Sequence, residues 1–285
     1  MPDKDLLLSD VERRVALREI VAFRTLSDDE LGAIARLSRR RELAPGSTTV
    51  IKSVQRIAVS LLGGDLRISR MGRLSQVSQA SPVLGMYWLA RDSMPLELYT
   101  ERGAVLLEFP ADRLDEVLEE HFSVWLSIAQ AMASWLLNLA PVSPLQTAGR
   151  RAESAVTRLT ERIAALQEAI PFARGYVDAL MQLDEEAVTV RYEPGDVIWR
   201  AGDAADRVLV VLDGRLRGVT AEEPSGIGSL ELFANRPRTT TLEAVEPTTA
   251  LQIGKELLYD LVEDQHELAR DLLAMIAASI VQLVE

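Results

Sequence analysis

The chain has 285 residues, of which 48% are hydrophobic and 26% charged, and its formal net charge is −12 at pH 7. This length allows one large domain or two ordinary ones, and we expect two. The absence of cysteine excludes disulfides, thiolate zinc sites and thiol catalysis, and two histidines leave little material for imidazole chemistry. The acidic balance argues against nucleic acid as a partner, because phosphate backbones are bound by clustered Lys and Arg.

The sequence also bears on the cellular compartment. The first residues, MPDKDLLLSD, lack the basic-then-apolar layout of a signal peptide. No apolar run approaches the roughly 20 residues needed to cross a bilayer. We therefore expect a cytoplasmic protein with no membrane partner. One dense basic cluster, Arg36 with Arg39, Arg40 and Arg41, is interpreted as a solvated helix end rather than a binding patch.

The first part of the chain is expected to run from helices through short strands to helices. Two sequences with capping-box spacing, starting at Ser9 and Ser27, predict helices that begin near residues 10 and 28. After Pro45-Gly46 the pattern changes to short β-rich pieces, TTVI, RIAVSLL, DLRIS and AVLLEF. Helical periodicity returns over residues 112–139. Together these elements predict a first domain over residues 1–140.

A second unit follows a short connection. The stretch PVSPLQTAG, with two prolines in its first four residues, predicts a linker over residues 141–150. The next helix, over residues 150–170, carries an apolar seam that we expect to pack on its own domain rather than in a coiled coil. The helical piece YVDALMQLDEEA, the strands DVIW, RVLVVL, RLRGV, TTLEAV and TTALQI, and helices over residues 255–285 complete a second domain, residues 151–285.

The two units match one another in sequence. LEFPADRLDEVLEEHF aligns with LQIGKELLYDLVEDQH at a constant offset, 253 − 109 = 144. SLLGGDLRIS aligns with VVLDGRLRGV, which places Gly64 opposite Gly214. Pro45-Gly46 lies opposite Pro194-Gly195. Because the matches come in the same order in both halves, we interpret the chain as a duplication with changed loops.

The second unit resembles the cyclic nucleotide-binding domain family over roughly residues 171–285. The resemblance rests on YEPGDVIWRAGDAADRVLVVLDGRLRG, where Gly195, Gly202 and Gly214 stand at the family's turn glycines, and on GSLELFANRPRTTT. It implies an antiparallel β-roll of jelly-roll type flanked by helices, the last of which respond to the ligand. The expected fold class is α+β, with two tandem β-rolls. The first unit resembles the family at fewer positions, because it lacks the loop that carries Gly202.

The segment GIGSLELFANRPRTTT is the candidate site. A short helix that opens after Gly228 would direct backbone N–H groups and its positive dipole end at a phosphate. Arg238 could bind the same anion, and the Thr239 hydroxyl could add a hydrogen bond. The resemblance identifies this segment as the family's phosphate-binding cassette. The candidate ligand-binding residues are therefore Gly228, Ser229, Leu230, Arg238 and Thr239.

One cassette position departs from the family pattern. Ser229 stands where the family has a glutamate that accepts from the ribose 2′-hydroxyl. Losing that carboxylate costs about 1–3 kcal/mol of ligand binding, which predicts weak binding of a cyclic nucleotide. Glu231, two residues on, is expected to face elsewhere if the segment runs from strand to helix, whereas a change of register would restore a glutamate at this position. The alternative interpretation of Arg238 is structural, with its guanidinium paired to Glu231 or Glu243.

The corresponding stretch of the first unit, LGMYWLARDSMPLELYT, departs further. Met86 stands at the glutamate position, Leu96 stands where the arginine would follow, and Arg91 is not expected to substitute for it. A phosphate diester would lose its hydration there without meeting a positioned cation. The first unit is therefore interpreted as a fold that is retained without its ligand.

Two classes of function remain from the sequence. The leading hypothesis is a non-enzymatic regulatory or sensor module that has no cofactor and whose second domain binds a cyclic nucleotide or a similar small anionic ligand. Its signal would pass to a partner protein or through self-association, since no effector follows the last helix. The alternative is a ligand-free interaction or oligomerisation scaffold. An enzyme is disfavoured, because we identify no nucleophile, metal cluster or phosphate loop.

Overall fold

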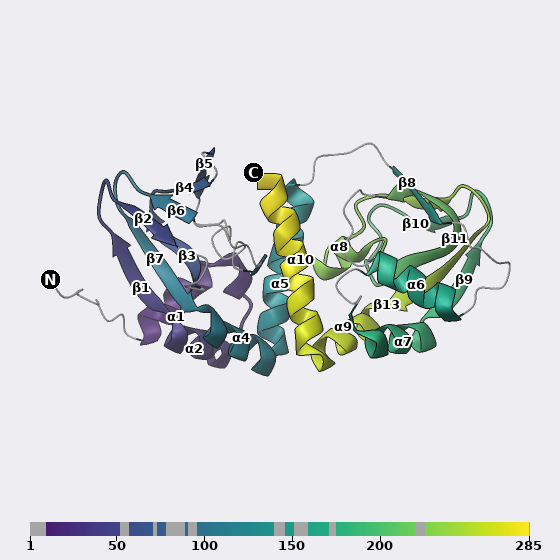
Figure 1. Cartoon of the computed structure of the whole chain (residues 1–285), viewed down its shortest axis with the longest axis horizontal. Helices are drawn as coiled ribbons and strands as arrows, with labels where there is room; N and C mark the ends of the chain where they lie inside the picture. Colours follow the sequence, from purple (N-terminus) through teal and green to yellow (C-terminus); the bar gives the residue numbers. More distant parts are fainter. Residues whose placement is uncertain are drawn as a thin grey trace. The chain divides into compact units, whose positions relative to one another are not determined.

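The computed structural model describes residues 10–51, 57–70, 73–77, 89–90, 96–139, 146–150, 159–170, 175–219 and 226–284. The chain divides into two compact units (Figure 1). Unit 1 contains residues 1–132 and 277–285, and unit 2 contains residues 133–276. The divisions fall inside two long helices, α5 (Phe122–Leu139) and α10 (His266–Val284).

Unit 1 has two antiparallel sheets, with strand orders β1-β7-β3 and β2-β6-β4-β5. Helices precede and follow the strands along the chain. The elements before α5 are α1 (Asp10–Glu19), the 3₁₀ helix η1 (Val21–Phe23), α2 (Asp28–Leu37), β1 (Arg39–Leu43), β2 (Thr48–Ile51), β3 (Ile57–Gly64), β4 (Leu66–Arg70), β5 (Arg73–Val77), β6 (Leu96–Tyr99), β7 (Ala104–Pro110) and α4 (Ala111–Glu120).

Unit 2 has one curled antiparallel sheet with the order β10-β12-β11-β13-β9, and β8 also pairs with β11. The elements between α5 and α10 are β8 (Gln146–Arg150), α6 (Leu159–Ala169), α7 (Val177–Glu186), β9 (Val188–Tyr192), β10 (Val197–Trp199), β11 (Arg207–Val219), α8 (Ser229–Phe233), β12 (Leu242–Ala244), β13 (Thr248–Gly254) and α9 (Lys255–Asp264).

The predicted α+β class with antiparallel rolls and flanking helices is confirmed. The strands predicted from the sequence are present, but β1, β5, β6 and β9 were not predicted. RVLVVL and RLRGV join into the single long strand β11, whose pairing with β13 shifts register between Val211 and Asp213. The helical segment predicted over residues 112–139 is divided at His121 into α4 and α5, and the helices predicted over residues 255–285 are α9 and α10, which meet at Gln265. The amphipathic pattern ran through the break at His121 and therefore did not reveal it.

Strand pairing follows the sequence match between the units. Leu61 pairs with Leu106 in unit 1, and the residues aligned with them, Val211 and Ala250, pair in unit 2. The register shift recurs at the same place, between Leu61 and Gly63 and between Val211 and Asp213. A β-bulge changes the direction and twist of its strand. A bulge at the same aligned position therefore means that both sheets bend at corresponding points.

Two matched glycines end these strand segments with positive φ. Gly64 has φ +90° and Gly214 has φ +103°. A Cβ atom on Gly64 would overlap the carbonyl oxygen of Gly103, and one on Gly214 would overlap that of Pro247. Both positions therefore require glycine, for the backbone angle and for the close approach of another strand.

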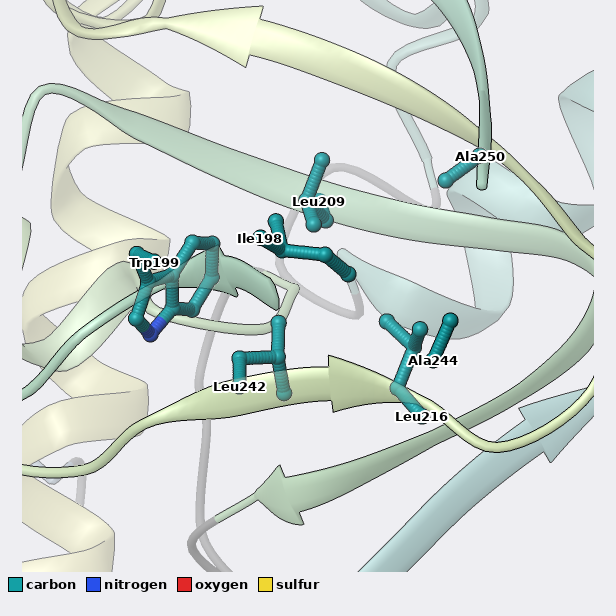
Figure 2. Close-up of a cluster of buried hydrophobic side chains, with 7 residues drawn as sticks. All are labelled: Ile198, Trp199, Leu209, Leu216, Leu242, Ala244 and Ala250. Carbon is teal, nitrogen blue, oxygen red and sulfur yellow. The ribbon is translucent and has the colours of Figure 1, made fainter. Parts of the chain in front are cut away.

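The hydrophobic core of the unit 2 roll lies between β10, β11, β12 and β13 (Figure 2). Small and large side chains meet there from strands far apart in sequence. Its buried members are Ile198, Trp199, Leu209, Leu216, Leu242, Ala244 and Ala250.

Two features differ from the sequence-based expectations. Of the basic cluster only Arg36 lies in the last turn of a helix, α2, whereas Arg39, Arg40 and Arg41 lie on β1, where Arg41 forms an ion pair with Glu108 at 2.9 Å. Within the predicted linker, residues 146–150 form β8 and pair with β11, while residues 141–145 lie outside the described residues.

Helix α5 is 18 residues long and, by length and composition alone, apolar enough to cross a membrane. No such segment was expected from the sequence. Part of its apolar surface, including Val124, Trp125, Ile128 and Met132, is already buried inside the protein. Burial of this kind is the behaviour of a core helix, so length and hydropathy carry little weight as evidence for a membrane span.

Candidate functional site

The candidate site is built around α8, a single helical turn. Gly228 immediately before it has φ +85°, in the left-handed region, and Gly226 has φ +87°. Between them Ile227 forms an isolated antiparallel bridge with Leu209 of β11. All five residues of α8 are buried. The two glycines therefore turn the chain sharply from the sheet into a helix turn whose side chains all lie inside unit 2.

Arg238 is buried, with 3% of its surface exposed. Its Nη1 donates to the carbonyl oxygen of Gly228 at 2.7 Å, and its Nη2 donates to the carbonyl oxygen of Arg207. The guanidinium carbon lies 4.0 Å from the ring centroid of Trp199, a member of the core cluster that Figure 2 shows. Arg238 therefore joins the start of α8 to the start of β11, over an aromatic face.

The neighbouring arginine and the backbone angle both restrict which residue can stand at position 228. A Cβ atom at position 228 would overlap Nη1 of Arg238 and lie 3.0 Å from the Trp199 ring. The residue must therefore be glycine for two separate reasons, its φ and the space that the guanidinium takes.

Glu231 is the second charged group of the site and is also buried, with 3% exposed. Its Oε1 accepts from the backbone N–H of Thr239 at 3.2 Å and from the Thr239 hydroxyl. The structural alternative paired Arg238 with Glu231 or Glu243. The hydrogen bonds of Arg238 go instead to backbone carbonyls, while Glu243 pairs with Arg217.

Several amides of the α8 segment bond within the segment itself. Ser229 N–H donates to the carbonyl of Gly226 at 3.3 Å, and Leu232 N–H donates to that of Gly228 at 3.4 Å. Ser229 is fully buried and Leu230 is 3% exposed. The structure thus brings all five predicted residues together, with Gly228, Ser229 and Leu230 at the start of α8, Arg238 bonded to Gly228, and Thr239 bonded to α8 through Glu231.

The loop that contains Gly202 forms backbone hydrogen bonds with Arg238. The backbone N–H of Arg238 donates to the carbonyl of Asp203 at 2.8 Å, and its own carbonyl accepts from Gly202 N–H at 2.9 Å. Asp203 in turn accepts from Arg200 N–H through its carboxylate at 2.7 Å. These bonds fix the backbone of Arg238, and hence the position of Thr239 beside it.

The C-terminal end of α8 contacts α9. The Tyr259 hydroxyl donates to the carbonyl of Leu232 at 3.2 Å, and the Tyr259 ring stacks on Phe233 with centroids 6.1 Å apart. Lys255 donates to the side chain of Asn235 at 2.9 Å. Burial raises the pKa of Tyr259 to about 12, and Glu256 adds to the effect. The hydroxyl therefore stays protonated and able to donate at physiological pH.

Sequence reasoning missed two members of the site, Glu231 and Trp199. Glu231 was expected to face elsewhere or to pair with Arg238, and Trp199 was not identified as part of the site. A glutamate inside the short apolar sequence SLELF is the one local signal, because an ionisable residue among buried ones needs a partner. The contact between Trp199 and Arg238 has no local signal at all.

The stretch of unit 1 that corresponds to the site is described only in part. Met86 and Arg91 lie outside the described residues, and Leu96 begins β6. Among the described residues no group of three or more His, Cys, Asp or Glu side chains could hold a metal ion.

Comparison with known proteins places the site in a family. Residues 189–265 match the model of the cyclic nucleotide-binding domain. The chain is 28% identical over 111 residues to lysophospholipase nte1 of Neurospora crassa, a match that covers 35% of this chain and 7% of that protein. It is 35% identical over 100 residues to a patatin-like phospholipase domain-containing protein of Caenorhabditis elegans, covering 33% and 7%. The chain therefore spans a tenth or less of the length of these curated relatives.

The solved structures that resemble the chain do so with low TM-scores. The regulatory domain of Toxoplasma gondii PKA with cAMP is 14% identical, with a TM-score of 0.33, over 93% of this chain and 96% of that one. The N-terminal domain of a transcriptional regulator from Streptomyces coelicolor A3(2) is 24% identical, with a TM-score of 0.36, over 41% and 93%. With both TM-scores low, the assignment depends on the sequence match. Residues 189–265, which hold the cassette, Arg238 and Tyr259, belong to the cyclic nucleotide-binding domain family.

Proposed function

We propose that the chain is a non-enzymatic regulatory module whose C-terminal domain binds a small anionic phosphate ligand, such as a cyclic nucleotide, and passes the change to a partner protein or to a second copy. The ligand contacts Gly228, Ser229, Leu230, Arg238 and Thr239. No cofactor takes part, and neither nucleic acid nor a membrane is a partner. The proposed compartment is the cytoplasm.

One observation carries this proposal. The α8 turn is bonded at its start to Arg238 and at its end to Tyr259 of α9. A ligand that moves the Arg238 guanidinium breaks its hydrogen bond to the Gly228 carbonyl and so frees the start of α8 to shift. A shift of α8 moves the Leu232 carbonyl, to which the Tyr259 hydroxyl of α9 donates. Such a ligand shifts the population of two arrangements only if it binds one of them more tightly.

We further propose that unit 1 is a second copy of the same domain that has lost its ligand. The support is the common strand register, the bulge at one aligned position and the matched pair Gly64 and Gly214. In this proposal residues 1–140 and 151–285 are the two domains, and residues 141–150 connect them.

The test is titration calorimetry of the full chain with cyclic AMP and cyclic GMP. We expect weak binding to the wild type that falls at least about tenfold in Arg238→Ala, because a charge-assisted hydrogen bond to the ligand is lost. Arg217→Ala removes an exposed arginine of the same roll and is expected to bind as the wild type does. Circular dichroism establishes that each variant is folded, and Thr239→Val serves as the second variant if Arg238→Ala is not.

A ligand-free interaction scaffold is the second candidate. The hydrogen bonds of the site also fit this candidate. Nη1 and Nη2 of Arg238 already donate to the carbonyls of Gly228 and Arg207, and the N–H and hydroxyl of Thr239 already donate to Glu231. No heat of binding at about 1 mM of either nucleotide would favour this candidate over the sensor. Light scattering across a concentration series then tests self-association.

A further inference from the structure

The carboxylate of Glu231 is bonded to Thr239, one of the residues proposed to contact the ligand. Glu231 comes from the middle of α8, and its neighbours Leu230 and Leu232 are buried with it. Only 3% of its surface reaches solvent. A carboxylate so placed is stable only if hydrogen-bond donors replace the water it has lost.

Both donors of that kind come from Thr239. Its backbone N–H and its hydroxyl converge on one oxygen, Oε1 of Glu231. A backbone N–H and a hydroxyl directed at one point form a small anion cradle, and a phosphate oxygen accepts from such groups as readily as a carboxylate oxygen does. Because Thr239 has one N–H and one O–H, a single anion oxygen uses both.

The cradle is fixed before any ligand arrives. Thr239 follows Arg238, whose backbone is held on both sides by the loop of Gly202 and Asp203. A phosphate that approached Thr239 would find its donors in use and a negative charge in its place. Two anions in one buried site repel, and neither could recover the hydration that it lost.

We infer that Glu231 is a built-in anion that occupies the phosphate position at Thr239, so that any phosphate ligand must first displace it. The inference rests on the proposed function in that it takes Thr239 as a ligand contact. It accounts for the use of both Thr239 donors by a side chain of the cassette itself. It also makes Glu231 the residue that sets the affinity threshold of the domain.

The test compares the full-length wild type with Glu231→Ala, which empties the cradle, and Glu231→Gln, which keeps an acceptor but removes the charge. Glu243→Ala is the matched control, because Glu243 lies on the neighbouring strand β12 and pairs with the exposed Arg217. Cyclic AMP and inorganic phosphate are titrated separately, with calorimetry and the thermal unfolding midpoint as readouts.

We expect Glu231→Ala to bind cyclic AMP about 10- to 100-fold more tightly than the wild type, the range for freeing hydrogen bonds to a charged group. Phosphate should raise the unfolding midpoint of Glu231→Ala more than that of the wild type. Glu231→Gln should show a smaller gain, and Glu243→Ala none.

The possible failures are distinguishable. Equal affinity in the wild type and both Glu231 variants overturns the inference while leaving the proposed function in place. A gain of phosphate binding in Glu231→Ala, with neither cyclic AMP nor phosphate bound by the wild type, supports the inference and defeats the proposed function. No response to either ligand in any variant overturns both. If Glu231→Ala does not fold, Glu231→Gln decides, and wild-type affinity in that variant overturns the inference.

Discussion

Arg238 shows how one buried cation can organise a small domain. The desolvation of a guanidinium is costly, and here it is offset by two carbonyl acceptors and by the face of Trp199. The acceptors belong to Gly228 and Arg207, which are far apart in sequence. The side chain is therefore a structural tie, whether or not a ligand also uses it.

Arg238→Ala is expected to lower the free energy of unfolding of unit 2 by about 2–4 kcal/mol, because two buried carbonyls lose a charged donor and the contact with Trp199 is lost. Urea denaturation of the full chain measures the change. The control is Arg217→Ala, whose ion pair with Glu243 is half-exposed and should contribute less than about 1 kcal/mol. Equal losses in the two variants would contradict the buried position of Arg238.

At the scale of single elements, a helix start was predictable where a capping box marks it, whereas the helix predicted over residues 150–170 is described only from Leu159, as α6. The sequence predicted a helix start near residue 28, and α2 begins at Asp28 with the complete capping box of Ser27 and Glu30. Glu30 also accepts from the hydroxyl of Ser123 in α5. Hydrogen bonds from Ser123 and then Ser27 are the main causes that lower the pKa of Glu30 below its ordinary value of 4.5.

The lowered pKa of Glu30 predicts that its contribution to stability decreases as the pH falls. Because the folded chain holds Glu30 ionised more firmly than the unfolded chain does, its contribution is complete above about pH 4.5 and is lost as pH falls through the lower folded pKa. We therefore expect wild type to exceed Glu30→Gln in stability at pH 7, with the difference shrinking below pH 4.5. Urea denaturation across this range measures it, and a difference independent of pH would contradict the assignment.

Tyr259 makes the opposite prediction for α9. Its pKa is about 12 in the folded chain and about 10 when unfolded, so its contribution is complete below pH 10 and is lost as pH rises toward 12. Tyr259→Phe should cost about 0.5–1.5 kcal/mol at neutral pH through the lost bond to Leu232. Raising the pH from 10 toward 12 should therefore lower the free energy of unfolding of the wild type more than that of Tyr259→Phe, as measured by urea denaturation at each pH. Parallel curves for the two proteins would argue that the hydroxyl is not buried against α8.

What could not be predicted at this scale was determined by distant partners. The segment QTAGR has neither alternation nor β-branched density, and it becomes β8 only because Gly214 to Val219 of β11 pair with it. Likewise, the spacing of Glu231 and Thr239 does not reveal that they meet. Periodicity reports which face of an element is buried, whereas pairing across the fold decides what that face touches.

For the whole molecule, the sequence predicted two related units and the structure divides into two, although the division falls inside α5 and α10. The glycine matches were the informative signal. Gly64 and Gly214 sit at equivalent places in the two sheets, each with a backbone that leaves no room for a Cβ atom. Gly46 and Gly195 also correspond and also have positive φ, but nothing lies within 4 Å of the Cβ position of either.

These four glycines allow a test of how independently the units unfold. An alanine at Gly46 or Gly195 suffers only the backbone penalty of a left-handed residue, about 1–2 kcal/mol. At Gly64 or Gly214 the same penalty is joined by a clash with backbone that cannot move aside, so we expect a larger loss, above about 3 kcal/mol. If each unit has its own core, calorimetry of the full chain should resolve two transitions, with Gly64→Ala lowering only one and Gly214→Ala only the other. A single transition lowered equally by both variants would instead mean that α5 and α10, which contribute to both units, make the chain unfold as one cooperative body.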